Sequence, residues 1–127
     1  MSRPRIRTLK PECWQDEKIG RLSRDARLLF VGLITLADDE GRFRALPSVI
    51  LGHVFPYDSD AARRLQGWLD ELAAPGLVVF YEHAQTAYGA LPNWAQHQRV
   101  NRANESDLPP PSVNGHGSIT ERSVSKT

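Results

Sequence analysis

The chain has 127 residues, of which 40% are hydrophobic, so it has the size of one small domain with a tail. Its single cysteine excludes an internal disulfide and a cysteine-rich zinc site, and no apolar stretch approaches the roughly 20 residues of a membrane span. The formal net charge is +1, so any case for nucleic acid must rest on where the charges lie.

The N-terminal segment 2–10 is the most basic part of the chain, because it carries four basic residues and no acid. Such an arm is typical of contacts to DNA phosphates or to the minor groove. A solvated terminus that pairs with acids of its own domain has the same composition, and both interpretations stay open. The basic residues are Arg3, Arg5, Arg7 and Lys10.

We expect a short helix at 16–22, followed by a longer helix that Ser23 caps and that ends near Ala37. Apolar residues recur on one face of the longer segment, which predicts a core helix. The three adjacent acids at 38–40 have no partnering histidine or second acid cluster, so we interpret them as an exposed turn. Gly41 would supply a positive φ there, and nearby arginines would balance the charge.

Residues 42–45 are expected to form a short strand, with Phe43 facing inward and the arginines facing outward. Pro47 then stands where the first residue of a helix would be, and this helix runs to about Phe55. A turn is expected at 56–58.

An amphipathic helix follows, which Asp58 or Ser59 can cap and which stops at Pro75. Its outer face carries basic and amide groups in the N-terminal half and acids in the C-terminal half. That order suits a helix that enters the DNA major groove by its N-terminal end. An ordinary surface helix would favour the reverse order, with acids first and bases last. We predict that Arg63, Arg64 and Gln66 read bases and that Ser59 contacts the DNA backbone.

The apolar runs 77–81 and 86–91 are expected to pair as a hairpin with its tip at 82–85. The tip contains no Lys or Arg, so we expect this wing to touch the DNA backbone only lightly. A helical turn or short helix is expected at 93–102, where Trp94 packs on the core. Arg99 and Arg102 of this segment are predicted to contact the DNA backbone.

Together these elements predict an α+β fold, a winged helix-turn-helix in the order helix, strand, helix, helix, hairpin, with short terminal helices. The domain is expected to span 1–104. The Pro-, Ser- and Gly-rich segment 105–127 is expected to be a disordered linker or tail. The expected core residues are Phe30, Leu33, Phe43, Leu65, Trp68, Leu69, Leu72 and Trp94.

Five stretches of the sequence resemble the N-terminal domain of phage and prophage replication-initiation proteins, known as replisome organisers or DnaD-like proteins. The resemblance covers about 1–111 and implies a winged-helix domain that binds a replication origin in a bacterial cytoplasm. In that family a region beyond a flexible linker recruits the helicase or its loader, and we expect that region to be absent here. The stretches are 5–14, 26–33, 36–44, 54–58 and 92–102.

Two other functions are consistent with the predicted fold. A winged-helix transcriptional regulator would use the same DNA-binding surface at a promoter. A protein-interaction module without DNA binding would explain the near-neutral charge and the uncharged wing. No nucleophile–base pair, phosphate loop or metal cluster is visible, so we predict neither an enzyme nor a cofactor or metal site. The DNA target and a homodimer are left open.

Overall fold

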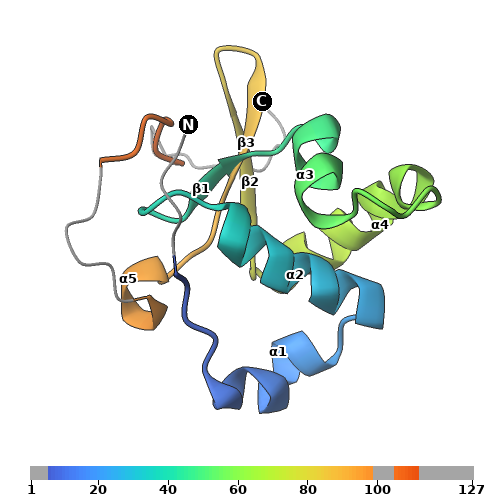
Figure 1. The fold of residues 1–127 in the computed structure, drawn as a ribbon. Coiled ribbons are helices and arrows are strands. Elements are labelled where there is room, and N and C mark those ends of the chain that lie inside the picture. Colours follow the sequence, from blue (N-terminus) through green and yellow to red (C-terminus); the bar gives the residue numbers. More distant parts are fainter. Residues whose placement is uncertain (1–5, 99–104, 112–127) are drawn as a thin grey trace.

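The computed structural model describes residues 6–98 and 105–111, and these form an α+β fold (Figure 1). The order of elements is the predicted one, and it is compatible with a winged-helix-like fold. Within the described ranges, no helix has the length and apolar character needed to span a membrane. The elements are a 3-10 helix η1 (Pro11–Gln15), α1 (Glu17–Gly20), α2 (Arg24–Leu36), β1 (Arg42–Arg44), α3 (Pro47–Val54), α4 (Ala61–Ala73), β2 (Val79–His83), β3 (Thr86–Ala90) and α5 (Trp94–His97).

The central helix α2 begins as predicted, because the Ser23 hydroxyl accepts a hydrogen bond from the Ala26 amide at 3.2 Å. Its buried face carries Leu29 and Leu33, both of which are inaccessible to solvent. Both α3 and α4 pack against this face, so α2 is the core helix that its periodicity predicts.

The start of α4 differs from the prediction. Neither Asp58 nor Ser59 caps the helix; Asp60 occupies the N-cap position, and its side chain makes no capping hydrogen bond. The end of α4 agrees with the prediction, because Gly76 has a φ of +80° and lets the chain turn. The Leu77 amide then donates to the Leu72 carbonyl at 3.1 Å, which caps the helix and leads the chain into the sheet.

The three strands form one antiparallel sheet in the order β1-β3-β2. Strand β2 runs two residues further than predicted, to His83, which pairs with Thr86 of β3, so the turn contains only Ala84 and Gln85. Both turn residues have positive φ, 52° and 67°, as the tight turns of hairpins require. This hairpin projects beyond the helices at the top of Figure 1.

The core lies between the sheet and the three helices α2, α3 and α4. Phe43 of β1 is 2% exposed and packs edge-on against Phe80 of β2, with ring centroids 6.3 Å apart. Gly89 of β3 lies between these two residues in the sheet. Glycine is needed there because a Cβ at that position would overlap the Phe43 ring. The predicted core residues Leu33, Phe43, Leu65, Trp68, Leu69 and Leu72 are buried, and Phe30 and Trp94 are partly buried against them.

The N-terminal segment is attached to the last helix. The Thr8 amide donates to the Gln98 side chain, and the Gln98 side-chain amide donates back to the Thr8 carbonyl, each at 2.8 Å. Gln98 is therefore buried between the N-terminal segment and the end of α5. Helix α5 is a single helical turn, Trp94–His97, within the predicted segment 93–102.

Residues 105–111 pack on the domain, beyond the boundary predicted at 104. We call this segment the strap. Its Leu108 carbonyl accepts a hydrogen bond from Arg42, and its Pro109 carbonyl accepts one from Tyr81. Composition alone assigned these residues to a disordered linker, whereas the structure includes them in the domain. Residues 112–127 lie outside the described residues.

Candidate nucleic-acid interface

The candidate reading surface is the exposed face of α4, opposite the core residues Leu65 and Trp68. Arg63 is exposed on this face, and it makes no ion pair with any described residue. Gln66 is also exposed, and its amide donates to Asp70 one turn later at 3.0 Å. This single surface hydrogen bond is readily exchanged for another partner. Arg63 and Gln66 therefore remain available to a ligand.

Arg64 lies beside Arg63 in the sequence but makes contacts within the domain. Its Nη1 atom is 3.4 Å from Asp25 of α2 and 3.6 Å from Asp60, and its guanidinium lies over the Trp68 ring at 5.2 Å. These contacts connect α4 to α2. They must be broken before Arg64 can reach a base, so it is a weaker candidate for base reading than Arg63.

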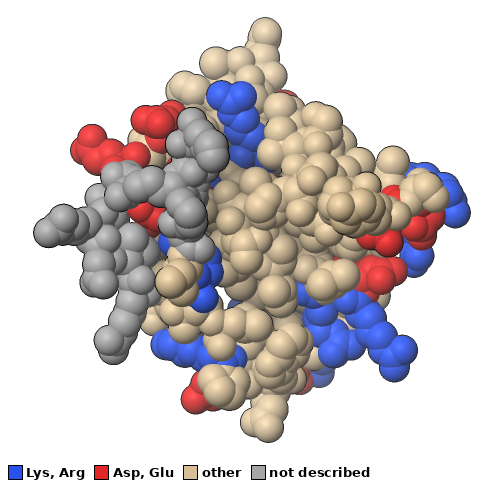
Figure 2. Space-filling view, in the orientation of Figure 1, with Lys and Arg blue, Asp and Glu red and all other residues tan. Residues whose placement is uncertain are grey.

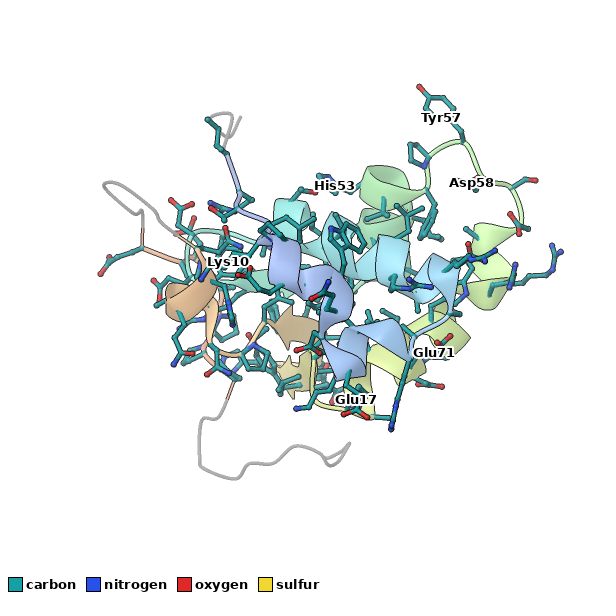
Figure 3. The ribbon with its side chains drawn as sticks, turned by 90° about the horizontal axis from the view of Figure 1, so that it is seen from below. Lys10, Glu17, His53, Tyr57, Asp58 and Glu71 are labelled. Carbon is teal, nitrogen blue, oxygen red and sulfur yellow. The ribbon has the colours of Figure 1, made fainter. Side chains whose placement is uncertain are left out.

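The turn between α3 and α4 presents the most exposed aromatic side chain of the described residues. Tyr57 is 96% exposed and points away from the body of the molecule, as Figure 3 shows. Ser59, predicted to contact the DNA backbone, is exposed in the same turn. Asp58 and Asp60 are also there, and their charges would oppose an approaching phosphate. The sequence prediction did not select Tyr57, although an aromatic residue in a polar turn is a usable signal.

Arg7, which was predicted to contact a DNA phosphate, has a side chain that is only 5% exposed in this structure. The guanidinium donates to the Asp39 carboxylate at 2.9 Å and to the Ala37 carbonyl at 3.1 Å, and it lies over the Trp94 ring. Arg7 therefore pairs with an acid of its own domain, which was the alternative interpretation of the arm. Lys10 is exposed and donates to the Gln96 carbonyl at 3.3 Å.

Four predicted backbone contacts have no structural description. Arg3, Arg5, Arg99 and Arg102 all lie outside the described residues.

The acidic residues 38–40 form the predicted turn before Gly41, but of the three only Glu40 is exposed. Asp38 accepts hydrogen bonds from the Glu40 and Arg42 amides at 2.9 and 3.1 Å, and Gly41 has a φ of +82°. Arg42 pairs with Glu40 at 3.3 Å. No group of three or more His, Cys, Asp or Glu residues in the described part of the chain is placed to hold a metal ion.

The hairpin tip carries Glu82, His83 and Gln85, and all three are exposed. A basic side chain lies nearer its base: Arg44 of β1 is exposed and pairs in register with Tyr88 of β3. The sequence analysis predicted that Arg44 points outward but assigned it no function. The alternation around Phe43, which places both flanking arginines on the outer side of the sheet, was the available signal.

The charge around these residues is mixed. The described residues contain ten Lys and Arg against fourteen Asp and Glu, a formal net charge of −4. Figure 2 shows basic and acidic side chains alternating around the end of the molecule that carries α4. Non-specific electrostatic attraction to DNA phosphates is therefore weak on this part of the chain. A DNA complex would depend on direct contacts of side chains with the bases. Comparisons with protein-family models, with curated proteins and with solved structures found no match to this chain.

Proposed function

We propose that this chain is a winged helix-turn-helix protein that binds double-stranded DNA in a sequence-specific manner, with α4 in the major groove. One observation carries the proposal: Arg63 and Gln66 stand exposed on the N-terminal half of a 13-residue helix whose opposite face is fully packed. That helix follows a short turn after α3 and leads into the β2–β3 hairpin. These are the parts of a recognition helix and its wing.

The chemistry of the two side chains indicates which bases they would select. An arginine guanidinium can make two parallel hydrogen bonds to guanine, and a glutamine amide can do the same with adenine. Each such pair discriminates against the wrong base by about 1–3 kcal/mol. Arg63 and Gln66 are separated by three residues, so they lie on one face of α4 and would contact neighbouring base pairs.

The biological setting of this binding is inferred from the sequence resemblance. It favours the origin-binding domain of a phage or prophage replication-initiation protein, acting in the cytoplasm of a bacterial host. The helicase or its loader would then be the protein partner. A transcriptional regulator would present the same α4 surface, and the position of the bound sites in the genome distinguishes the two.

A second candidate function is a protein-interaction module built on the same fold. The net charge of −4 on the described residues favours it, because a DNA-binding surface is usually basic. The exposed side chains of Tyr57 and Trp14, 96% and 56% accessible, also suit a protein interface.

A salt-titrated binding assay separates these functions. Binding sites for the full chain are first enriched from a pool of random duplex DNA. The affinity for the enriched sequence is then compared with the affinity for random sequence at several salt concentrations. We expect the enriched site to be bound at least about 100-fold more tightly. Arg63→Ala should remove this preference. Lys18→Ala, which removes one exposed charge from α1, should keep it. Failure to bind any duplex at low salt would favour the protein-interaction module.

A further inference from the structure

Tyr81 is buried on the side of the sheet that faces away from the core. Its neighbour Phe80 packs against Phe43 in the core, and successive side chains of a strand point to opposite faces. Tyr81 therefore points outward, where it stacks on Tyr88 with ring centroids 5.7 Å apart. Even so, Tyr81 is only 8% exposed. A segment outside the sheet must cover it.

The covering segment is the strap. The Tyr81 hydroxyl donates a hydrogen bond to the Pro109 carbonyl at 2.6 Å. Arg42, on the same outer face, donates from Nη1 to the Leu108 carbonyl at 3.0 Å. Prolines have no amide hydrogen, so a proline-rich segment offers hydrogen-bond acceptors and almost no donors. The outer face of the sheet supplies the complementary donors.

A second set of hydrogen bonds holds the strap at Ser106, two residues before Leu108. The Ser106 hydroxyl donates to the Asp38 carboxylate, and the Ser106 amide donates to the Glu40 carboxylate at 2.8 Å. The Leu108 amide donates back to the Ser106 hydroxyl at 3.0 Å. A serine and two carbonyls are thus recognised together, in a segment of the form Ser-x-Leu-Pro.

We propose that the outer face of the sheet is a peptide-binding site for Ser-x-Leu-Pro segments, and that the strap occupies it as an intramolecular ligand. The site consists of Asp38, Glu40, Arg42 and the Tyr81–Tyr88 pair. The proposal does not rest on DNA binding, because the strap lies on the opposite side of the molecule from α4 (Figure 1). Proline-rich segments commonly bind aromatic surfaces in this way, since little conformational entropy is lost.

The strap competes strongly with any separate peptide, because it is covalently joined to the domain. A ligand joined to its site by a short linker acts at an effective concentration of about 1 mM or more. A separate peptide of the same sequence can therefore bind well only when the strap is displaced. Ser106→Asp should displace it, because the new carboxylate would lie against Asp38 and Glu40 while the site itself is unchanged.

The test uses the full chain and the synthetic peptide Glu-Ser-Asp-Leu-Pro-Pro-Pro, with binding followed by the NMR signals of the Tyr81 and Tyr88 rings. We expect saturable shifts in the Ser106→Asp chain and at least tenfold weaker binding to the wild-type chain. The matched control is Pro110→Asp, which adds the same charge at an exposed strap position. It should behave as the wild type. Tyr57 serves as an internal reference whose signals should not move.

Specificity is tested with the same peptide carrying alanine in place of serine, which should bind the Ser106→Asp chain at least tenfold more weakly. If the Ser106→Asp chain does not fold, as judged by circular dichroism, Ser106→Ala provides the same contrast with a smaller amplitude. Absence of shifts at Tyr81 and Tyr88 up to about ten times the effective concentration would overturn the proposal. Equal binding of the two peptides would overturn it as well.

Discussion

The Nη1 atom of Arg64 lies 3.4 Å from the Oδ2 atom of Asp25, so the second arginine of α4 connects this helix to α2. The preceding residue, Arg63, is rotated by about 100° around the helix axis and makes no ion pair with a described residue. Two adjacent arginines with the same appearance in the sequence therefore have different structural roles. Their substitutions should have different consequences.

Arg63→Ala should weaken binding to the selected DNA site by about 10- to 100-fold, which corresponds to the loss of one bidentate base contact. Its free energy of unfolding should change by less than about 0.5 kcal/mol, because the side chain is exposed and makes no ion pair with a described residue. Fluorescence anisotropy with labelled duplex measures the first quantity, and urea denaturation measures the second.

Arg64→Ala is the control for this experiment. It should lower the free energy of unfolding by about 0.5–1 kcal/mol, since a half-exposed ion pair and a cation–π contact are lost. Its effect on DNA affinity should be smaller than that of Arg63→Ala. The assignment of Arg63 as the base-reading residue would be wrong if the two variants showed the reverse order in binding.

Arg7→Met should destabilise the domain by about 3 kcal/mol, because it removes one member of a buried ion pair and leaves the Asp39 carboxylate without that partner. Urea denaturation checks this value. Lys10→Ala, an exposed change in the same segment, should cost less than about 0.5 kcal/mol. A DNA-contacting Arg7 would give the opposite result: unchanged stability and weaker binding to all sequences.

The contrast between Arg7 and the helices shows what the sequence could predict. The helices α2 and α4 and the hairpin follow from periodic burial, which is a local pattern and is visible along a few turns. The burial of Arg7 depends on Asp39 and Trp94, which are 32 and 87 positions away in the sequence. Nothing within the basic arm predicts that Arg7 reaches these partners.

The strap was missed for a similar reason. A proline run next to polar residues has the composition of a linker, and it has no periodicity that would indicate burial. It is ordered because the outer face of the sheet presents donors from Arg42 and Tyr81 to its carbonyls. The alternation of side chains along β2 places Tyr81 on the outer face of the sheet, but a local pattern does not indicate which segment covers it.

Gly89→Ala should destabilise the domain by about 1–3 kcal/mol, because the added Cβ would overlap the Phe43 ring and force the core to shift. The matched control is Gly52→Ala in α3, where no heavy atom lies within 4 Å of the added Cβ. It should stabilise the domain by about 0.5–1 kcal/mol through helix propensity. Thermal denaturation of the two variants should therefore move in opposite directions.

The pKa of the Tyr81 phenol is raised well above its ordinary value of 10.0. Burial is the main cause; Asp38 and Tyr88 raise it further, and Arg42 opposes them. In the folded protein Tyr81 therefore keeps its proton at a pH where the unfolded chain has lost it. The stabilisation linked to this group is complete below pH 10 and is lost as the pH rises above it.

Tyr81→Phe should remove this part of the pH dependence, because phenylalanine has no proton to lose. It should also lower stability at pH 8 by about 1 kcal/mol through the missing hydrogen bond to Pro109. Urea denaturation of both chains at pH 8, 9, 10 and 10.5 gives the comparison, and other alkaline groups cancel in the difference. We expect the stability of the wild type to fall more steeply above pH 10 than that of the variant. Parallel curves would show that Tyr81 is accessible to solvent and that the strap does not cover it.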